Sequence, residues 1–248
     1  MSDRQHLLDQ LAHAIAAVSR PHPVRVAIDG VDAAGKTGLA DDLVGPLRAR
    51  GYPVIRASLD SFHHPREVRH RRGATSPEGY YYDSFDYPAL KSLLLEPLGP
   101  GGSLRYQTAL FDGRSEAALS SPVRTAGLHS VLLFDGVFLF RPELEDCWDL
   151  RIWVEVTFEV MLGRVIRRDS SLFGGDAAVR ERYQQRYIPG QRLYLAQCRP
   201  REQAHLIVDN NNPLHPVLHV GRNLTGAGEL GMRTIEEFDL GLQQKGDG

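Results

Sequence analysis

The feature that most constrains this chain of 248 residues is the segment 30–37, GVDAAGKT, which has the pattern G-x-x-x-x-G-K-T. An apolar run over 24–28 precedes it, and a pattern typical of a helix follows over 36–50. The glycines allow backbone N–H groups to curl around phosphate oxygens, and the start of the following helix adds partial positive charge. A glycine-rich turn with a surface lysine is the plain alternative. The flanking strand and helix favour a nucleoside-triphosphate site.

This motif supplies the first group of candidate site residues. Lys36 is expected to reach the β- and γ-phosphates and to act in catalysis, and the Thr37 hydroxyl can ligate Mg²⁺. The residues predicted to bind ATP (or GTP) are Gly30, Asp32, Ala33, Ala34, Gly35, Lys36, Thr37 and Gly38.

The remaining patterns alternate between strands and helices, which indicates a parallel sheet covered on both faces. Strands are expected over 24–28, 54–59, 131–134, 150–156 and 205–208, and helices over 5–18, 36–50, 87–98, 157–168 and 177–198, the last interrupted near Pro189-Gly190. A long functional loop is expected over 61–86, and a hairpin with a turn over 103–127. Ligands of such sheets bind at the carboxyl ends of the strands. Asp29-Gly30, Asp60 and Asp135 all fall at such ends.

Two of these carboxylates are candidates for the chemistry. Asp135 closes the apolar run V-L-L-F-D-G, where an acidic residue can hold Mg²⁺ beside the phosphate loop. Asp60 can orient an acceptor hydroxyl, take its proton and reach the magnesium shell through water. A strand-end turn at Asp135 and a helix-cap or loop role for Asp60 are the structural alternatives.

Three further segments carry side chains suited to binding. The basic run over 63–72 suits anions, although a solvated loop explains it equally well. The run YYYDSFDYP over 80–88 suits a flat ring and ribose hydroxyls, or a packed aromatic corner. Arg164, Arg167 and Arg168 precede the Gly174-Gly175 pair, a mobile joint. Arginines on a closing lid stabilise charge on a transferring phosphoryl group, although cations are also common at helix C-termini.

Composition narrows the classes of protein to which this chain could belong. A net charge of −2 argues against a general nucleic-acid binder. The chain carries no pattern of a signal peptide and no apolar run of membrane-spanning length, so we expect a cytoplasmic protein. The two cysteines match no metal-ligand spacing. The expected partners are a small-molecule acceptor and a nucleoside triphosphate, and a homo-oligomer stays open.

Together these pieces resemble the uridine kinase and phosphoribulokinase family of P-loop kinases over about 24–212. The resemblance rests on the order and spacing of the P-loop with Asp29, of Leu59-Asp60-Ser61-Phe62, of Phe85-Asp86-Tyr87-Pro88, of Leu133-Phe134-Asp135-Gly136, of Arg168-Asp169 and of 204–210. It implies an α/β fold, a doubly wound parallel sheet with a helical lid. The expected organisation is one kinase domain over 1–225, with an acceptor-binding insertion at about 60–115, a lid at about 163–190 and a peripheral tail over 226–248.

The resemblance also implies residue roles and a reaction, the ATP- or GTP-dependent phosphorylation of a sugar hydroxyl, usually the 5′-hydroxyl of a nucleoside. Asp60 would be the base, Arg168 a lid arginine in catalysis, Asp86 the ribose contact and Tyr106 the pyrimidine neighbour. Arg186 falls where uridine kinases often carry glutamine. The expected substrate-binding residues are Asp60, Phe85, Asp86, Tyr106, Arg164 and Arg186, and the expected Mg²⁺ ligands are Thr37, Asp60 and Asp135.

Two departures from the family pattern keep other readings open. The stretch 106–114, YQTALFDGR, lacks the histidine that reads the pyrimidine edge, and SSLFGG over 170–175 replaces the expected lid arginines. A uridine- or cytidine-type nucleoside kinase is the leading hypothesis. A related kinase acting on pantothenate, a pentose phosphate or a hexose is the second. A nucleotide-dependent switch or ATPase is the third, although the chain lacks the Asn-Lys-x-Asp motif of GTPases.

Overall fold

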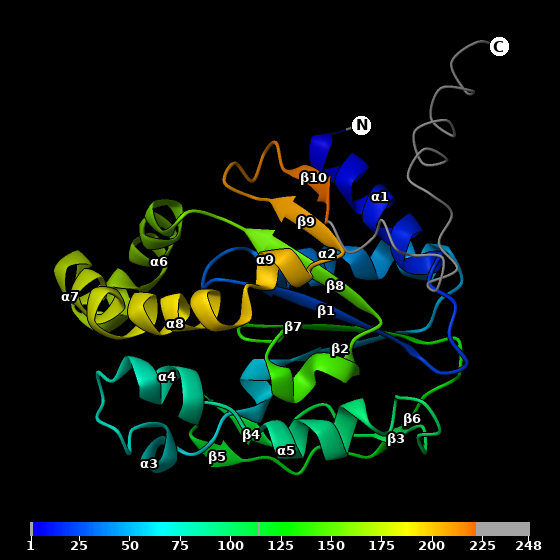
Figure 1. The fold of residues 1–248 in the computed structure, drawn as a ribbon, viewed down its shortest axis with the longest axis horizontal. Coiled ribbons are helices and arrows are strands. Elements are labelled where there is room, and N and C mark those ends of the chain that lie inside the picture. The colour runs from blue at the N-terminus through cyan, green and yellow to red at the C-terminus, as the bar shows by residue number, and fades with distance from the viewer. Residues whose placement is uncertain (1, 114, 222–248) are drawn as a thin grey trace.

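A computed structural model describes residues 2–113 and 115–221, and its centre is a six-stranded sheet with the order β10-β9-β8-β1-β7-β2 (Figure 1). The strands are β1 (Val24–Gly30), β2 (Val54–Ser58), β7 (Val131–Gly136), β8 (Leu150–Glu155), β9 (Leu206–Asp209) and β10 (Val217–Val220). The first five run parallel, and β10 pairs antiparallel with β9. The α/β fold with a mostly parallel sheet is therefore confirmed. The strand β10 escaped prediction because its side chains are mostly exposed and give no apolar run.

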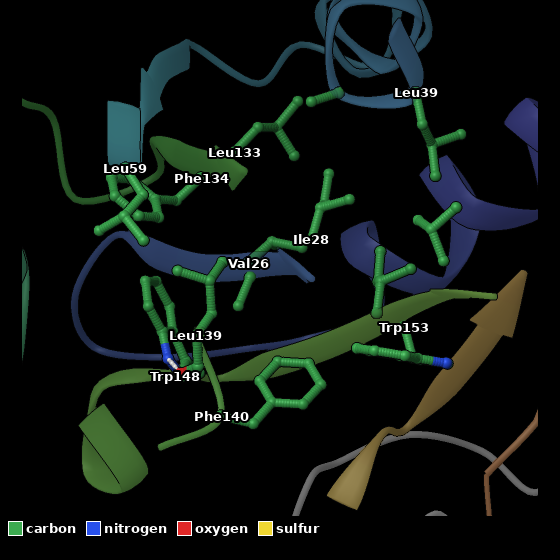
Figure 2. Packing of buried hydrophobic residues seen from close by; sticks show 14 of the residues in the cluster. Val26, Ile28, Leu39, Leu59, Leu133, Phe134, Leu139, Phe140, Trp148 and Trp153 are labelled. Carbon is green, nitrogen blue, oxygen red and sulfur yellow. Dashed lines mark hydrogen bonds between the residues drawn. The ribbon is translucent and has the colours of Figure 1, made fainter. Parts of the chain in front are cut away.

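The core surrounds β1 and β7, in which every residue is buried. Figure 2 shows the side chains of these strands between Leu39 of α2 (Lys36–Ala49) and Trp148. The Trp148 ring stacks on Phe134 with centroids 5.5 Å apart, and its Nε1 donates to the Leu139 carbonyl at 2.8 Å. Strands buried on both faces read as continuous apolar runs, which is why these two were found from the sequence.

Helix α2 packs on β1, β2 and β7, and α1 (Asp3–Ala16) packs on α2. Helix α1 is capped by Ser2, whose hydroxyl accepts from the Gln5 N–H at 3.3 Å. Among the described residues, no helix is long and apolar enough to cross a membrane.

The prediction of one long loop over 61–86 is wrong. The short 3-10 helix η1 (Leu59–Phe62) is followed by α3 (Arg66–Arg69) and α4 (Pro77–Asp83). Ser76 caps α4 by accepting from the Gly79 N–H at 3.0 Å, and the chain packs α4 against α8, so capping and tertiary contact order a polar stretch. The segment 87–98 is helical as expected, with α5 (Tyr87–Leu90) leading into the π-helical turn η2 (Lys91–Leu95).

Hairpin-like pairing over 103–127 is confirmed as two small antiparallel ladders. Strand β3 (Arg105–Tyr106) pairs with β6 (Arg124–Thr125), and β4 (Phe111–Asp112) pairs with β5 (Ala117–Ala118). The 3-10 helix η3 (Pro142–Cys147) then connects β7 to β8.

The segment expected to form a lid contains α6 (Phe158–Phe173), α7 (Asp176–Arg182), the π-helical turn η4 (Tyr183–Tyr187) and α8 (Ile188–Cys198). Helix α6 extends five residues beyond the predicted end at 168 and stops at Gly174, which has a left-handed φ of 84°. The expected interruption near Pro189-Gly190 is found as the π-helical turn η4, which ends two residues before Pro189 and runs directly into α8. Figure 1 shows α6, α7 and α8 at the same end of the sheet as α3 and α4.

A last short helix, α9 (Pro200–Gln203), leads into β9. The tail predicted to be peripheral after 225 lies outside the described residues. The boundaries of the insertion, the lid and the tail stay predictions.

Candidate active site

One cavity of about 640 Å³ lies where β1, β2 and β7 end, and residues of α4, α6, α7 and η4 line its other walls. Parallel strands place their carboxyl ends at one edge, so residues from three distant parts of the chain meet there. The predicted site residues that line the cavity are Asp32, Ala33, Gly35, Lys36, Thr37, Gly38, Asp60, Phe85, Asp135, Arg164 and Arg168.

The glycine-rich loop is held by contacts with its backbone. Gly35 has a left-handed φ of 101°, and a Cβ there would stand 2.6 Å from Nδ2 of Asn210. Asn210 Nδ2 donates to the Ala34 carbonyl at 2.6 Å, and Arg164 Nη1 donates to the Ala33 carbonyl at 3.1 Å. Arg164, predicted to bind substrate, thus supports the loop from α6. Lys36 Nζ donates to the Val31 carbonyl at 2.7 Å, across the same loop.

Thr37 and Asp135 meet beside this loop, where Thr37 Oγ1 donates to Asp135 Oδ2 at 2.6 Å. Asp60 lines the same cavity. Within residues 2–113 and 115–221, no group of three or more His, Cys, Asp or Glu side chains could hold a metal on its own. Mg²⁺ bound with a nucleotide commonly takes one or two carboxylates and completes its shell with phosphates and water. The hydroxyl and carboxylate here therefore fit a magnesium ion that binds together with phosphates.

Asp60 lies two residues after the end of β2 and is exposed. Ser58 Oγ accepts from the Asp60 N–H at 3.4 Å and donates to the Asp135 carbonyl at 3.2 Å, so one side chain ties the two strand ends together. His63 Nδ1 lies 2.9 Å from the Asp60 carbonyl oxygen, and its ring packs on Phe85 with centroids 4.5 Å apart. Burial lowers the pKa of His63, which favours the neutral form of its imidazole.

Asp32, inside the glycine-rich loop, joins the loop to helices α4 and α8. Its Oδ1 accepts from the Tyr80 hydroxyl of α4 at 3.1 Å, and its Oδ2 accepts from Nε2 of Gln191 in α8 at 3.0 Å. The Asp32 N–H in turn donates to Gln191 Oε1 at 3.1 Å. Sequence reasoning did not identify Gln191, because nothing in the spacing of residues 32 and 191 signals their contact.

A second carboxylate, Asp29, is completely buried below the loop. It accepts from the Gly30 N–H at 2.7 Å, from the Leu139 N–H at 2.9 Å and from the Tyr194 hydroxyl of α8. Burial outweighs these hydrogen bonds and raises the pKa of Asp29 from 3.8 to about 6.

Because this folded-state pKa lies above the unfolded value, the native state binds more protons than the unfolded state between about pH 4 and 6. The contribution of Asp29 to the free energy of unfolding is therefore greatest below about pH 4 and is lost as the pH rises through 6. The loss is on the order of 3 kcal/mol for a shift of about two pKa units. We expect Asp29→Asn to remove this part of the pH dependence, measured by urea unfolding at pH 4.5 and pH 7.5. Parallel profiles for the two proteins would contradict the assignment.

The arginines near the cavity differ in their partners. Arg168 is engaged by Asp169, with Nε 2.7 Å from Oδ1 and Nη2 2.9 Å from Oδ2. Arg182 of α7 also lines the cavity, and its guanidinium lies 4.8 Å from the centre of the Phe173 ring. Arg182 was missed from the sequence, although its place after Gly174-Gly175 was a usable signal. Tyr183 and Tyr187 of η4 extend the same wall.

Several predicted residues lie elsewhere. Gly30 and Ala34 belong to the loop but do not line the cavity, and neither do Asp86, Tyr106 and Arg186. Asp86 caps α5 by accepting from the Ala89 N–H at 2.9 Å, and Tyr106 is buried. Arg186 is buried and donates to the Ala74 carbonyl at 2.7 Å. Their predicted contacts with substrate stay predictions.

The basic run after β2 is bound largely by the protein itself. Arg69 forms an ion pair with Glu116, and Arg71 and Arg72 both form ion pairs with Asp83. The sequence left open whether this run binds anions or is a solvated loop. The ion pairs give these arginines a structural role instead.

Comparison with known proteins shows similarity to several that are named as kinases. No family model matches the chain. Uridine-cytidine kinase B of Dictyostelium discoideum is 28% identical over 151 residues, which are 60% of this chain and 59% of that protein. The chain thus spans about three fifths of the length of that relative.

Two solved structures share the fold. A possible uridine kinase from Bacillus stearothermophilus superposes with a TM-score of 0.65 at 20% identity, over 82% of this chain and 97% of that one. D-glycerate 3-kinase from Cryptococcus neoformans gives a TM-score of 0.53 at 17% identity, over 74% and 87% of the respective chains.

A fold shared with proteins named as kinases, with a glycine-rich loop at the end of β1, defines the class of protein to which this chain is similar. Within that class, the chain is similar to uridine kinases and uridine kinase-like proteins, and the resemblance drawn from its motifs is confirmed.

Proposed function

We propose that this chain is a Mg²⁺-dependent kinase that transfers the γ-phosphoryl group of ATP, or of GTP, to the 5′-hydroxyl of a uridine- or cytidine-type nucleoside. One observation carries the proposal. A single cavity contains the glycine-rich loop, the exposed Asp60 carboxylate and a wall of aromatic rings. Donor phosphates, a base and a surface for a flat ring are thereby brought together.

The residues of the chain divide the work in this proposal. Backbone N–H groups of the loop and Lys36 bind the phosphates and stabilise charge on the group in transfer. Thr37 and Asp135 would hold Mg²⁺, which neutralises charge on the β- and γ-phosphate oxygens when bound. Asp60 orients the acceptor hydroxyl and takes its proton as the oxygen attacks phosphorus. Arg168 and Arg182 lie on the wall that would exclude water.

The acceptor side of the cavity supports a flat substrate ring. Phe85, Tyr80, Tyr183 and Tyr187 line it, together with the His63 ring. Aromatic side chains offer such a ring large contact area at little cost in conformational entropy.

A second candidate is a kinase of the same fold that acts on another alcohol. The observation that favours it is the position of Asp86 and Tyr106, because the two residues expected to contact ribose and pyrimidine do not line the cavity. A protein of similar fold is named D-glycerate 3-kinase, and that name specifies an acceptor without a nucleobase.

The test is ADP production with Mg-ATP against uridine, cytidine, other nucleosides, pantothenate and sugar phosphates, with Lys36→Ala as the blank. We expect uridine or cytidine to raise ADP production at least about tenfold. Without an acceptor, water reacts slowly with ATP in this site, and binding of the acceptor closes the site around a hydroxyl group that can react. The product should be the 5′-monophosphate. If only a non-nucleoside stimulates ADP production, that compound replaces the nucleoside as the proposed acceptor. If ATP binds and no compound stimulates ADP production, the result supports a nucleotide switch.

A further inference from the structure

Arg56, on the edge strand β2, contacts the carboxylate that we assign to the magnesium site. Its Nη2 donates to Asp135 Oδ1 at 2.9 Å. Its Nη1 donates to the Leu133 carbonyl of the neighbouring strand at 2.9 Å, and its Nε donates to Asp41 Oδ1 of α2 at 2.9 Å. All three nitrogens are engaged, so the guanidinium is fixed against the end of β7.

The two oxygens of Asp135 therefore have different partners. Oδ1 accepts from the Arg56 guanidinium, and Oδ2 accepts from the Thr37 hydroxyl. The Asp135 side chain is only 2% exposed, so water contributes little to compensating its charge. A buried carboxylate without such compensation is strongly destabilising. Arg56 supplies a positive charge at this carboxylate when no metal is bound.

We propose that Arg56 is a positioning residue that makes metal binding at Asp135 depend on the nucleotide. This inference rests on the proposed function. A guanidinium and a divalent cation that share one carboxylate repel each other, so Arg56 weakens the affinity of the protein for free Mg²⁺. The phosphates of a bound nucleotide add negative charge, which offsets the repulsion between Arg56 and the metal ion. The same contact orients Asp135 so that its Oδ2 lies on the Thr37 side.

The experiment compares Arg56→Gln with Arg56→Lys, since the first removes the charge and the second retains it. Mn²⁺ serves as the probe for Mg²⁺, and free Mn²⁺ is measured by electron paramagnetic resonance, with and without ADP. For Arg56→Gln we expect nucleotide-free protein to bind Mn²⁺ about 5- to 150-fold more tightly than wild type, the usual range of coupling between two sites. The gain in affinity produced by ADP should shrink by the same factor.

Stability provides an independent readout. Removing one partner of a buried ion pair should lower the Tm of metal-free Arg56→Gln by roughly 5–10 °C. Mn²⁺ alone should restore part of this loss, because the metal then compensates Asp135. In the double variant Arg56→Gln/Asp135→Asn the tight Mn²⁺ binding should disappear. Arg4→Met, which breaks the exposed pair with Asp42, should change neither Mn²⁺ affinity nor, by more than about 1–2 °C, the Tm.

The possible failures are distinguishable. Wild-type protein that binds no Mn²⁺ in the presence of ADP would overturn the proposed function. Wild-type binding with equal Mn²⁺ affinities for Arg56→Gln and Arg56→Lys would overturn the inference and leave the function intact. If Arg56→Gln is too unstable for titration, Arg56→Lys/Asp41→Asn decides. This variant keeps the positive charge at position 56, so its Mn²⁺ affinity should equal that of wild type. A large increase in its Mn²⁺ affinity would contradict the proposal.

Discussion

Replacing Asp60 with asparagine is expected to lower kcat by on the order of 10²- to 10⁴-fold, the range that a positioned general base contributes. The side chain lines the cavity two residues beyond β2, and asparagine keeps its size but cannot accept a proton. The measurement is the rate of ADP formation with the acceptor that proves active in the substrate panel. Calorimetry with Mg-ADP should give a dissociation constant within about threefold of wild type, because the loop that binds phosphate is unchanged.

The matched control for Asp60 is Asp9→Asn in α1, which removes a half-buried carboxylate that pairs with Arg50 and does not line the cavity. Its kcat should equal that of wild type. Wild-type turnover by Asp60→Asn would show that the acceptor hydroxyl loses its proton elsewhere, and would withdraw the role we give this residue.

Replacing Lys36 with methionine is expected to lower kcat/KM by on the order of 10²- to 10³-fold, the loss that follows removal of one electrostatic donor from a transition state. Lys36 is buried at the start of α2, where its amine reaches only the Val31 carbonyl in this structure. Methionine has a similar length and no charge, so the packing changes little. Steady-state kinetics over a range of Mg-ATP concentrations measures the loss.

Lys91→Met is the matched control, because Lys91 lies in η2 and does not line the cavity. Its kinetics should match those of wild type. If kcat/KM of Lys36→Met equals that of wild type, the loop does not bind the phosphates as proposed, whatever the control shows.

Much of the fold could be predicted because its central strands are buried on both faces. Such strands read as short apolar runs, and β1, β7 and β8 were each located to within two residues. The edge strand β2 was located equally well, and its residues alternate between buried and half-buried. Strand β10 was missed because an edge strand with exposed side chains lacks that signal. The helices α3 and α4 were missed because local capping and contact with α8 order them, while their composition is polar and rich in proline and glycine.

The same division applies to the site. Lys36, Thr37, Asp60 and Asp135 could be found because each lies on or beside a strand end or in a motif of fixed spacing. The contacts of Gln191 and Arg56 could not, since neither follows a motif. Their roles depend on which side chains the packing of α8 and β2 places against the loop and β7. Asp86 and Tyr106 were assigned by resemblance, and the structure places both outside the cavity lining.

The parallel sheet, the glycine-rich loop and the chemical groups at the strand ends could be predicted from sequence patterns, because these features depend on local pattern and on a shared strand direction. The tertiary structure decided which of those groups share a cavity, which arginines are bound by carboxylates and which remain on its wall. Arg71 and Arg72 pair with Asp83, whereas Arg182, from another helix, lines the cavity. Such choices depend on distances between residues far apart in the chain, and a linear pattern contains no information about those distances.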